Sequence, residues 1–170
     1  PSSAASDVYK RQRYYKTGKP FLAVPSAIAA HNWQPMSFNP QAGLAYIPAQ
    51  IVGSAYLNPS SDLDKAKPLG FNVGQDLGNA MYPRDPAAVK QAIAGATGRL
   101  VAWDPVANKA RWTVDYPTPW NGGTMTTAGN LVFQGTALGE FRAYAADSGK
   151  QLFTYPVGTG IMACLLYTSP

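Results

Sequence analysis

Few side chains in this sequence could do chemistry, and their types limit the reactions that the chain can support. It has one histidine, His31, and one cysteine, Cys164, so it can form neither a multi-histidine metal site nor an internal disulfide, and it has no C-x-x-C-H haem attachment motif. Asp104 looks at first sight like a carboxylate base. The short stretch Gly158–Gly160 is not a phosphate loop, and no Walker or strand–GxGxxG–helix pattern occurs, which disfavours nucleotide cofactors.

Two pairs of neighbouring tryptophan and asparagine residues are the remaining candidates for a binding site. Asn32 precedes Trp33, and Asn121 follows Trp120. Amide and indole N–H groups donate hydrogen bonds, and an indole ring offers a flat apolar surface. Spacing alone favours a turn residue at Asn32 and an ordinary core aromatic at Trp33. For Trp120 and the Asn-Gly-Gly after it, turn chemistry and a lining role are equally good interpretations. His31 could hydrogen-bond near a pocket, but a lone histidine is more often a satisfied structural residue or an exposed one.

The composition predicts that mostly β structure positions these residues. The chain has 170 residues, of which 46% are hydrophobic, so it can bury a core. Its 16 glycines and 15 prolines, against only 14% charged residues, favour short strands joined by tight turns. The net charge of +5 comes from scattered Lys and Arg without a basic stripe, so we expect no nucleic-acid partner. No apolar run approaches the roughly 18 residues of a membrane-spanning helix, so we also expect no membrane span.

The two ends of the sequence differ from its middle. Residues 1–12 and 164–170 lack both strand alternation and turn punctuation, and they resemble translated adapter or vector sequence. The N-terminus also lacks the charged-then-apolar layout of a signal peptide. We therefore expect a native domain at residues 13–163, truncated at both ends.

One strand–turn–strand unit occurs twice. The heptapeptide GRLVAWD that starts at Gly98 matches GEFRAYA, which starts 41 residues later at Gly139, and Trp112 then corresponds to Phe153. A period in the low forties is typical of the four-stranded blades of a β-propeller. We expect the aromatic residues of this repeat to serve in blade packing.

Two hairpins and one helix complete the predicted elements. Thr126–Gly135 reads as a hairpin with Gly129-Asn130 at its turn, and Met36–Ile47 reads as a similar hairpin that lies 86 residues earlier, about two blades away. Between Gly53 and Gly98, residues 85–93 predict one short helix with proline near its start. The expected fold is therefore all-β, with several antiparallel four-stranded blades of a partial propeller and one short helix in a long loop.

A specific family resemblance rests on three segments. The run Ala102–Trp112, AWDPVANKARW, resembles the tryptophan-docking motif A-x-D-x3-G-x3-W of alcohol dehydrogenases that depend on pyrroloquinoline quinone (PQQ). His31–Gln50 and Trp120–Gly135 are similar to later parts of the same propeller, and they resemble the quinohaemoprotein branch more than methanol dehydrogenase. The resemblance covers residues 16–163. It implies that Asp104 is a structural hydrogen-bonding residue of the docking motif and not a base.

The resemblance implies part of an eight-bladed propeller that binds PQQ and Ca²⁺. It carries over Asn32 and Trp33 as PQQ contacts, and Trp120 becomes a candidate lining residue. In this family Ca²⁺ polarises a quinone carbonyl and an Asp acts as general base; both the calcium ligands and that Asp would lie upstream of residue 1. We therefore expect no catalytic residue and no metal ligand in the chain. The second repeat has Ala145 and Phe153 in place of Asp and Trp, which predicts a blade junction that is weaker or packed differently.

The implied activity is the oxidation of small alcohols to aldehydes or ketones in the periplasm, with electrons passed to a cytochrome c-type acceptor. A haem c in a further domain is consistent with the resemblance, and the fragment itself is expected to be inactive. Two alternatives stay open. One is a non-catalytic propeller scaffold of the bacterial envelope, which gives no reason for the Asn32-Trp33 pair. The other is a carbohydrate-binding β-domain, suggested only by exposed aromatic residues.

Overall fold

The chain forms two compact units. The computed structural model describes residues 21–26, 29–56 and 86–162. One unit contains Pro1–Ala27 and Gly53–Ile93, and the other contains Ile28–Val52 and Ala94–Pro170. The suspected adapter segments, residues 1–12 and 164–170, lie outside the described residues, and so does Cys164.

The first unit has one short strand pair and a helix. Strand β1 (Phe21–Ala23) pairs antiparallel with β4 (Ser54–Tyr56). Helix α4 (Pro86–Ala94) begins with a proline, which suits the first turn because that position needs no N–H donor. The helix expected at residues 85–93 is therefore present and is shifted by one residue.

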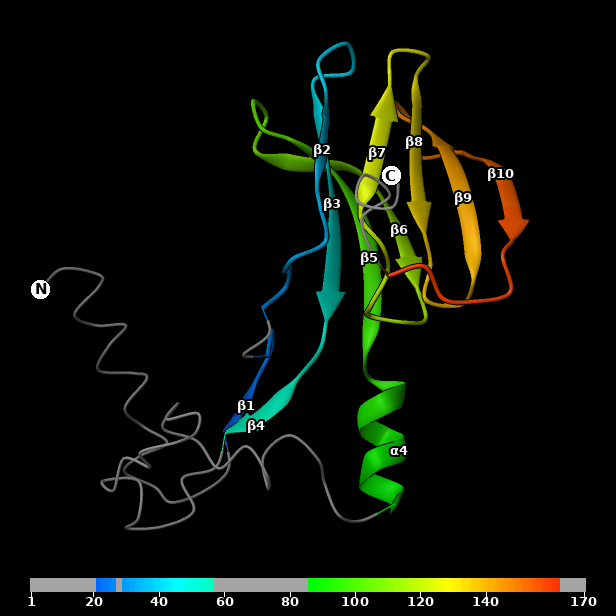
Figure 1. The fold of residues 1–170 in the computed structure, drawn as a ribbon. Helices are drawn as coiled ribbons and strands as arrows, with labels where there is room; N and C mark the ends of the chain where they lie inside the picture. Colours follow the sequence, from blue (N-terminus) through cyan, green and yellow to red (C-terminus); the bar gives the residue numbers. More distant parts are fainter. Residues whose placement is uncertain (1–20, 27–28, 57–85, 163–170) are drawn as a thin grey trace, which may run out of the picture. The chain divides into compact units, whose positions relative to one another are not determined.

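The second unit consists of two four-stranded antiparallel sheets (Figure 1). The first sheet has the order β2-β3-β5-β6 and the second has the order β7-β8-β9-β10. The strands of the first sheet are β2 (Ser37–Asn39), β3 (Leu44–Ile51), β5 (Thr97–Asp104) and β6 (Lys109–Tyr116). Those of the second sheet are β7 (Thr124–Thr127), β8 (Leu131–Gly135), β9 (Glu140–Ala145) and β10 (Gln151–Pro156). This arrangement confirms the predicted all-β class and the four-stranded blades.

The two copies of the repeat form the outer halves of neighbouring sheets. This arrangement corrects the predicted spacing of the two hairpins. The first copy of the 41-residue repeat forms β5 and β6, and the second copy forms β9 and β10, which occupy the same places in the order of the second sheet. The two predicted hairpins are β2–β3 and β7–β8, and they start adjacent sheets. The prediction that they lie about two blades apart is therefore wrong. The two hairpins are separated by more residues than one repeat period because a long interval lies between β3 and β5. The second sheet has no such interval between β8 and β9.

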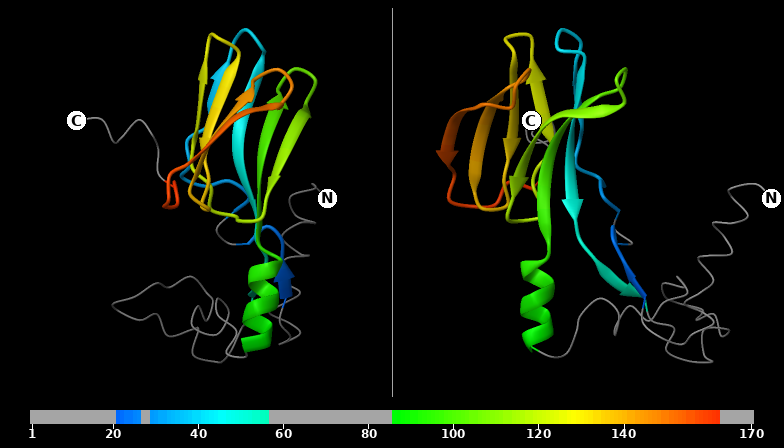
Figure 2. Two further views of the ribbon diagram at one scale, coloured as in Figure 1. Left: turned by 90° about the vertical axis from the view of Figure 1, so that its right-hand side faces the viewer. Right: turned by 180° about the vertical axis from the view of Figure 1, so that it is seen from behind.

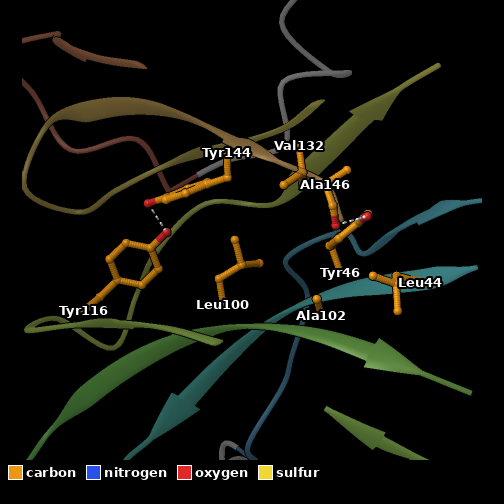
Figure 3. Close-up of a cluster of buried hydrophobic side chains, with 8 residues drawn as sticks. All are labelled: Leu44, Tyr46, Leu100, Ala102, Tyr116, Val132, Tyr144 and Ala146. Carbon is orange, nitrogen blue, oxygen red and sulfur yellow. Dashed lines mark hydrogen bonds between the residues drawn. The ribbon is translucent and has the colours of Figure 1, made fainter. Parts of the chain in front are cut away.

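A shared hydrophobic core joins the two sheets (Figure 3). Strand β5 alternates buried and partly exposed residues, so one of its faces enters the core. The buried side chains of the core are Leu44, Tyr46, Leu100, Ala102, Tyr116, Val132, Tyr144 and Ala146. The buried phenols still have polar partners, because the Tyr46 hydroxyl donates to the Ala146 carbonyl at 2.8 Å and the Tyr116 and Tyr144 hydroxyls lie 2.8 Å apart.

Trp112 docks the outer part of the first sheet onto the second. Its indole N–H donates to the Ala146 carbonyl at 3.1 Å, and its ring lies 5.6 Å from that of Tyr46 between centroids. The ring also lies against the backbone of Gly149, since a Cβ there would be 2.6 Å from two indole carbons. The predicted docking by Trp112 is therefore confirmed; Figure 2 shows the two sheets from two further sides.

Phe153, the counterpart of Trp112, behaves differently. It is 50% exposed and stacks on Tyr155 of its own strand, with the ring centroids 6.4 Å apart. The burial that we expected for Phe153 at a blade junction is thus not found within the described residues.

Candidate cofactor-binding site

The structure brings two of the predicted site residues together. The Trp33 and Trp120 rings stack with their centroids 6.4 Å apart and their planes inclined by 26°. Each tryptophan lies four residues before the first strand of its sheet, Trp33 before β2 and Trp120 before β7. The two therefore occupy equivalent positions in successive sheets, which the sequence analysis did not recognise.

Trp33 is not a core residue. Its side chain is 56% exposed, so the interpretation as an ordinary core aromatic is wrong. Asn32 beside it is also exposed. Trp120 is partly buried. An exposed indole next to a partly buried one forms an apolar surface with N–H donors at its edge, which suits a flat ligand that carries acceptor oxygens.

His31 has a structural role in the segment that carries Trp33. Its Nδ1 atom lies 2.7 Å from the carbonyl oxygen of Pro48 in β3. A carbonyl oxygen only accepts hydrogen bonds, so Nδ1 carries the proton and donates it. The structural interpretation of His31 is therefore the one that the contact supports.

The segment that carries Trp120 is held by the buried side chain of Asn121. The Asn121 amide donates to the Thr118 carbonyl at 2.7 Å, and its Oδ1 atom accepts from the Ala137 backbone N–H at 3.1 Å. Only 4% of Asn121 is exposed. Asn121 therefore fixes the loop and does not offer its amide to a ligand. Of the two interpretations of this residue, these contacts support turn chemistry and not a lining role.

A second buried amide holds the next residue of the same loop. Gln134 in β8 donates to the Gly122 carbonyl at 2.8 Å, and the Gly122 N–H donates to the Gly135 carbonyl at 2.9 Å. Gln134 also accepts a 2.9 Å hydrogen bond from the Tyr116 hydroxyl. Since burial leaves these groups no water to exchange with, the loop is anchored on the second sheet.

The inner strands β2 and β7 meet along a row of polar side chains that the sequence analysis missed. The Ser37 and Thr124 hydroxyls are 2.9 Å apart, and the Asn39 amide donates to the Thr126 hydroxyl at 3.1 Å. We call these four residues the inner seam. Polar residues alternate with exposed apolar ones in both strands, and this alternation is the signal that could have predicted the seam.

Comparison with known proteins gives a consistent result. No protein-family model matches the chain. It is 45% identical over 150 residues to quinohemoprotein alcohol dehydrogenase ADH-IIG of Pseudomonas putida, a match that covers 88% of this chain and 21% of the relative. It is 48% identical over 147 residues to the quinohemoprotein alcohol dehydrogenase of Comamonas testosteroni, covering 85% of this chain and 20% of that protein. The chain is homologous to a segment of the quinohaemoprotein alcohol dehydrogenases.

Solved structures agree with this homology. The structure of ADHIIG from Pseudomonas putida HK5 superposes with a TM-score of 0.77 at 43% identity, over 89% of this chain and 22% of that chain. A europium-containing methanol dehydrogenase, at 23% identity and a TM-score of 0.63, shares the fold. The chain spans about a fifth of the length of the relatives that it matches.

Asp104 has the structural role that its docking motif implies. Its carboxylate accepts from the backbone N–H groups of Ala107 at 2.8 Å and Val106 at 3.0 Å. These hydrogen bonds, the one from Ala107 first, hold the pKa of Asp104 below its usual value, which opposes a role as a base. Within the described ranges, no group of three His, Cys, Asp or Glu side chains could hold a metal ion, and no helix could cross a membrane.

Proposed function

We propose that this chain is the part of a PQQ-dependent alcohol dehydrogenase that forms one side of the cofactor pocket. The pairing of Trp33 with Trp120, in a chain homologous to quinohaemoprotein alcohol dehydrogenases, is the observation that carries the proposal. The whole protein would oxidise small alcohols to aldehydes or ketones with PQQ and Ca²⁺. It would act in the periplasm and pass electrons to a cytochrome c-type acceptor, with any haem c in a further domain.

The side chains of this pair suit PQQ, which is flat and carries three carboxylates and two quinone oxygens. The exposed face of Trp33 can stack on such a ring system, and the indole N–H groups can donate to its oxygens. Asn32, exposed beside Trp33, has an amide that can donate in the same way. When bound, PQQ supplies the group that accepts hydride from the alcohol.

The residues of this chain would bind and orient the cofactor and would not perform the chemical step. The indole rings would cover part of its surface and keep water away from it. The anchored loop of Trp120 would hold one ring in place, because Asn121 bonds the Ala137 N–H and Gln134 bonds the Gly122 carbonyl. We propose that the calcium ligands and the general base come from other parts of the whole protein.

Binding of PQQ to the purified chain tests the cofactor part of this proposal. Equilibrium dialysis with PQQ should detect binding to the wild type, and Trp33→Ala should weaken it by about tenfold, near the upper end of what a lost aromatic contact costs. Phe153→Ala is the matched control, because Phe153 is also an aromatic residue that is about half exposed, and it lies on the second sheet away from the tryptophan pair. Equal binding by the Trp33 and Phe153 variants, or no binding to any of them, would oppose the proposal and favour the scaffold alternative.

A chimera tests the activity of the whole protein. The matching segment of the Comamonas testosteroni enzyme would be replaced by this chain, whose identity to it is 48%. We expect PQQ- and Ca²⁺-dependent oxidation of an alcohol by the chimera, with reduced affinity for PQQ in its Trp33→Ala variant. A chimera that folds and binds PQQ but oxidises no alcohol would count against the dehydrogenase assignment.

A further inference from the structure

Pro35 of the Trp33 segment lies directly on Gly123 of the Trp120 segment. A Cβ atom placed on Gly123 would be 2.5 Å from Cδ, 2.7 Å from Cγ and 3.0 Å from N of Pro35. Carbon atoms do not approach this closely without displacement, so the proline ring occupies the space that any side chain at position 123 would need. Gly123 is buried, as expected for a backbone covered by a ring.

Hydrogen bonds hold this contact in register. The Thr124 N–H donates to the Pro35 carbonyl at 2.9 Å, and the Thr124 hydroxyl donates to the Tyr46 carbonyl at 3.1 Å. Pro35 comes two residues after Trp33, and Gly123 comes three residues after Trp120. The position of the proline ring on the glycine backbone therefore sets how far apart the two short segments, and their indoles, can lie.

We infer that Gly123 is a positioning residue for the Trp33–Trp120 pair, because its missing side chain lets Pro35 seat at the distance that the pair requires. The inference rests on the proposed PQQ site for its functional meaning, but the geometric part stands on the contacts alone. Not every glycine of this sheet has such a role. A Cβ on Gly129 would meet only the Thr127 hydroxyl, at 3.7 Å, which is an ordinary contact.

The anchoring of the Trp120 loop decides which segment would move if position 123 carried a methyl group. Residues 121 and 122 are tied to the second sheet by the contacts of Asn121, Gln134 and the Gly122 N–H. Ordinary contact begins at 3.4 Å and the clash is at 2.5 Å, so a shift of about 1 Å is needed. Pro35 would give way and carry Trp33 with it.

The experiment compares four variants of the full chain with the wild type: Gly123→Ala, Pro35→Ala, the double variant Gly123→Ala/Pro35→Ala, and Gly129→Ala as matched control. The first readout needs no ligand. Stacked indoles give an exciton couplet in the far-ultraviolet circular dichroism, and Trp33→Phe identifies the part that comes from this pair. The second readout is the dissociation constant for PQQ by equilibrium dialysis, and thermal unfolding monitors stability separately.

We expect Gly123→Ala to weaken the couplet, because a shift of about 1 Å changes the separation and angle of the two rings, and to bind PQQ about tenfold more weakly, because displaced contacts cost affinity. Gly129→Ala should match the wild type. The double variant should recover most of the couplet, since the new methyl group fills the space that the proline ring leaves, and such recovery is a non-additive effect that general destabilisation does not produce. Pro35→Ala alone should give an intermediate couplet.

An unchanged couplet in Gly123→Ala, or no recovery in the double variant, would overturn the inference. If Gly123→Ala does not fold, the double variant decides: it must fold and show the couplet. The two proposals fail differently. If the couplet is weakened and recovered but no variant binds PQQ, Gly123 remains a positioning residue and the PQQ site is refuted. If PQQ binds equally well to the wild type and to Gly123→Ala, the PQQ site stands and the positioning role of Gly123 is refuted.

Discussion

Trp112→Ala tests whether one aromatic residue joins the two sheets. The substitution removes the indole ring that packs against Gly149 and Tyr46. It also removes the hydrogen bond that the indole N–H donates to the Ala146 carbonyl. Truncation of a buried aromatic costs about 3–5 kcal/mol of the free energy of unfolding. Trp112 is only partly buried, so we expect a loss of about 3 kcal/mol, of which the hydrogen bond supplies about 1 kcal/mol.

The internal repeat provides the control for this prediction. Phe153→Ala makes the equivalent change in the second sheet, at a side chain that is 50% exposed, so it should cost less than about 1 kcal/mol. Trp112→Phe keeps the ring contact but not the donor, and should cost about 1 kcal/mol.

Urea unfolding followed by near-ultraviolet circular dichroism measures all three values. If Trp112→Ala costs no more than Phe153→Ala, the docking contact does not hold the sheets together, and the energetic reasoning is refuted even though the geometry remains.

Three further predictions concern pH, activity and association. Burial, with a smaller contribution from Asp147, raises the pKa of Tyr46 from 10.0 to about 12. The folded state therefore favours the neutral phenol, so its contribution to stability should be intact below pH 10 and be lost as the pH rises toward 12. Urea unfolding at several pH values should show this loss, and Tyr46→Phe should reduce it. The purified chain should reduce no dye in an alcohol-dependent manner with PQQ and Ca²⁺, because the family resemblance puts the calcium ligands and the base outside it; measurable turnover would contradict this. The chain should self-associate through the edge strand β10, where Leu152, Phe153 and Tyr155 are exposed, and a monodisperse monomer in size-exclusion chromatography would disprove this.

The sequence was most informative where structure is local. The repeat at Gly98 and Gly139 predicted the outer hairpins of both sheets, because strand alternation and turn residues act over a few neighbours. The docking role of Trp112 could also be predicted, because the run Ala102–Trp112 resembles the tryptophan-docking motif. The spacing of the inner hairpins was misleading, because the long interval between β3 and β5 has no counterpart in the second sheet.

The candidate site was less predictable because its contacts join residues far apart in the chain. The inner seam links Ser37 to Thr124 and Asn39 to Thr126, each pair 87 residues apart. The alternation in each strand marks a polar face, but it does not identify the strand that this face meets. No local signal pairs Pro35 with Gly123 either. Trp33 shows a further limit, because spacing alone favours a core position for this tryptophan, whereas it is 56% exposed.

The contacts between the two sheets differ in kind at the two ends of the strand order. The outer strands are joined by an apolar contact, Trp112 on Gly149, and the inner strands by the polar seam between β2 and β7. Both tryptophans of the candidate site lie just before the inner strands, so their spacing depends on the seam and on Gly123. Trp112→Ala should therefore lower stability while the Trp33–Trp120 couplet persists in the molecules that stay folded. Gly123→Ala should change the couplet more than it changes stability. If both variants changed the two quantities in the same proportion, the sheets would behave as one cooperative body, and no separate positioning device would be needed to explain the site.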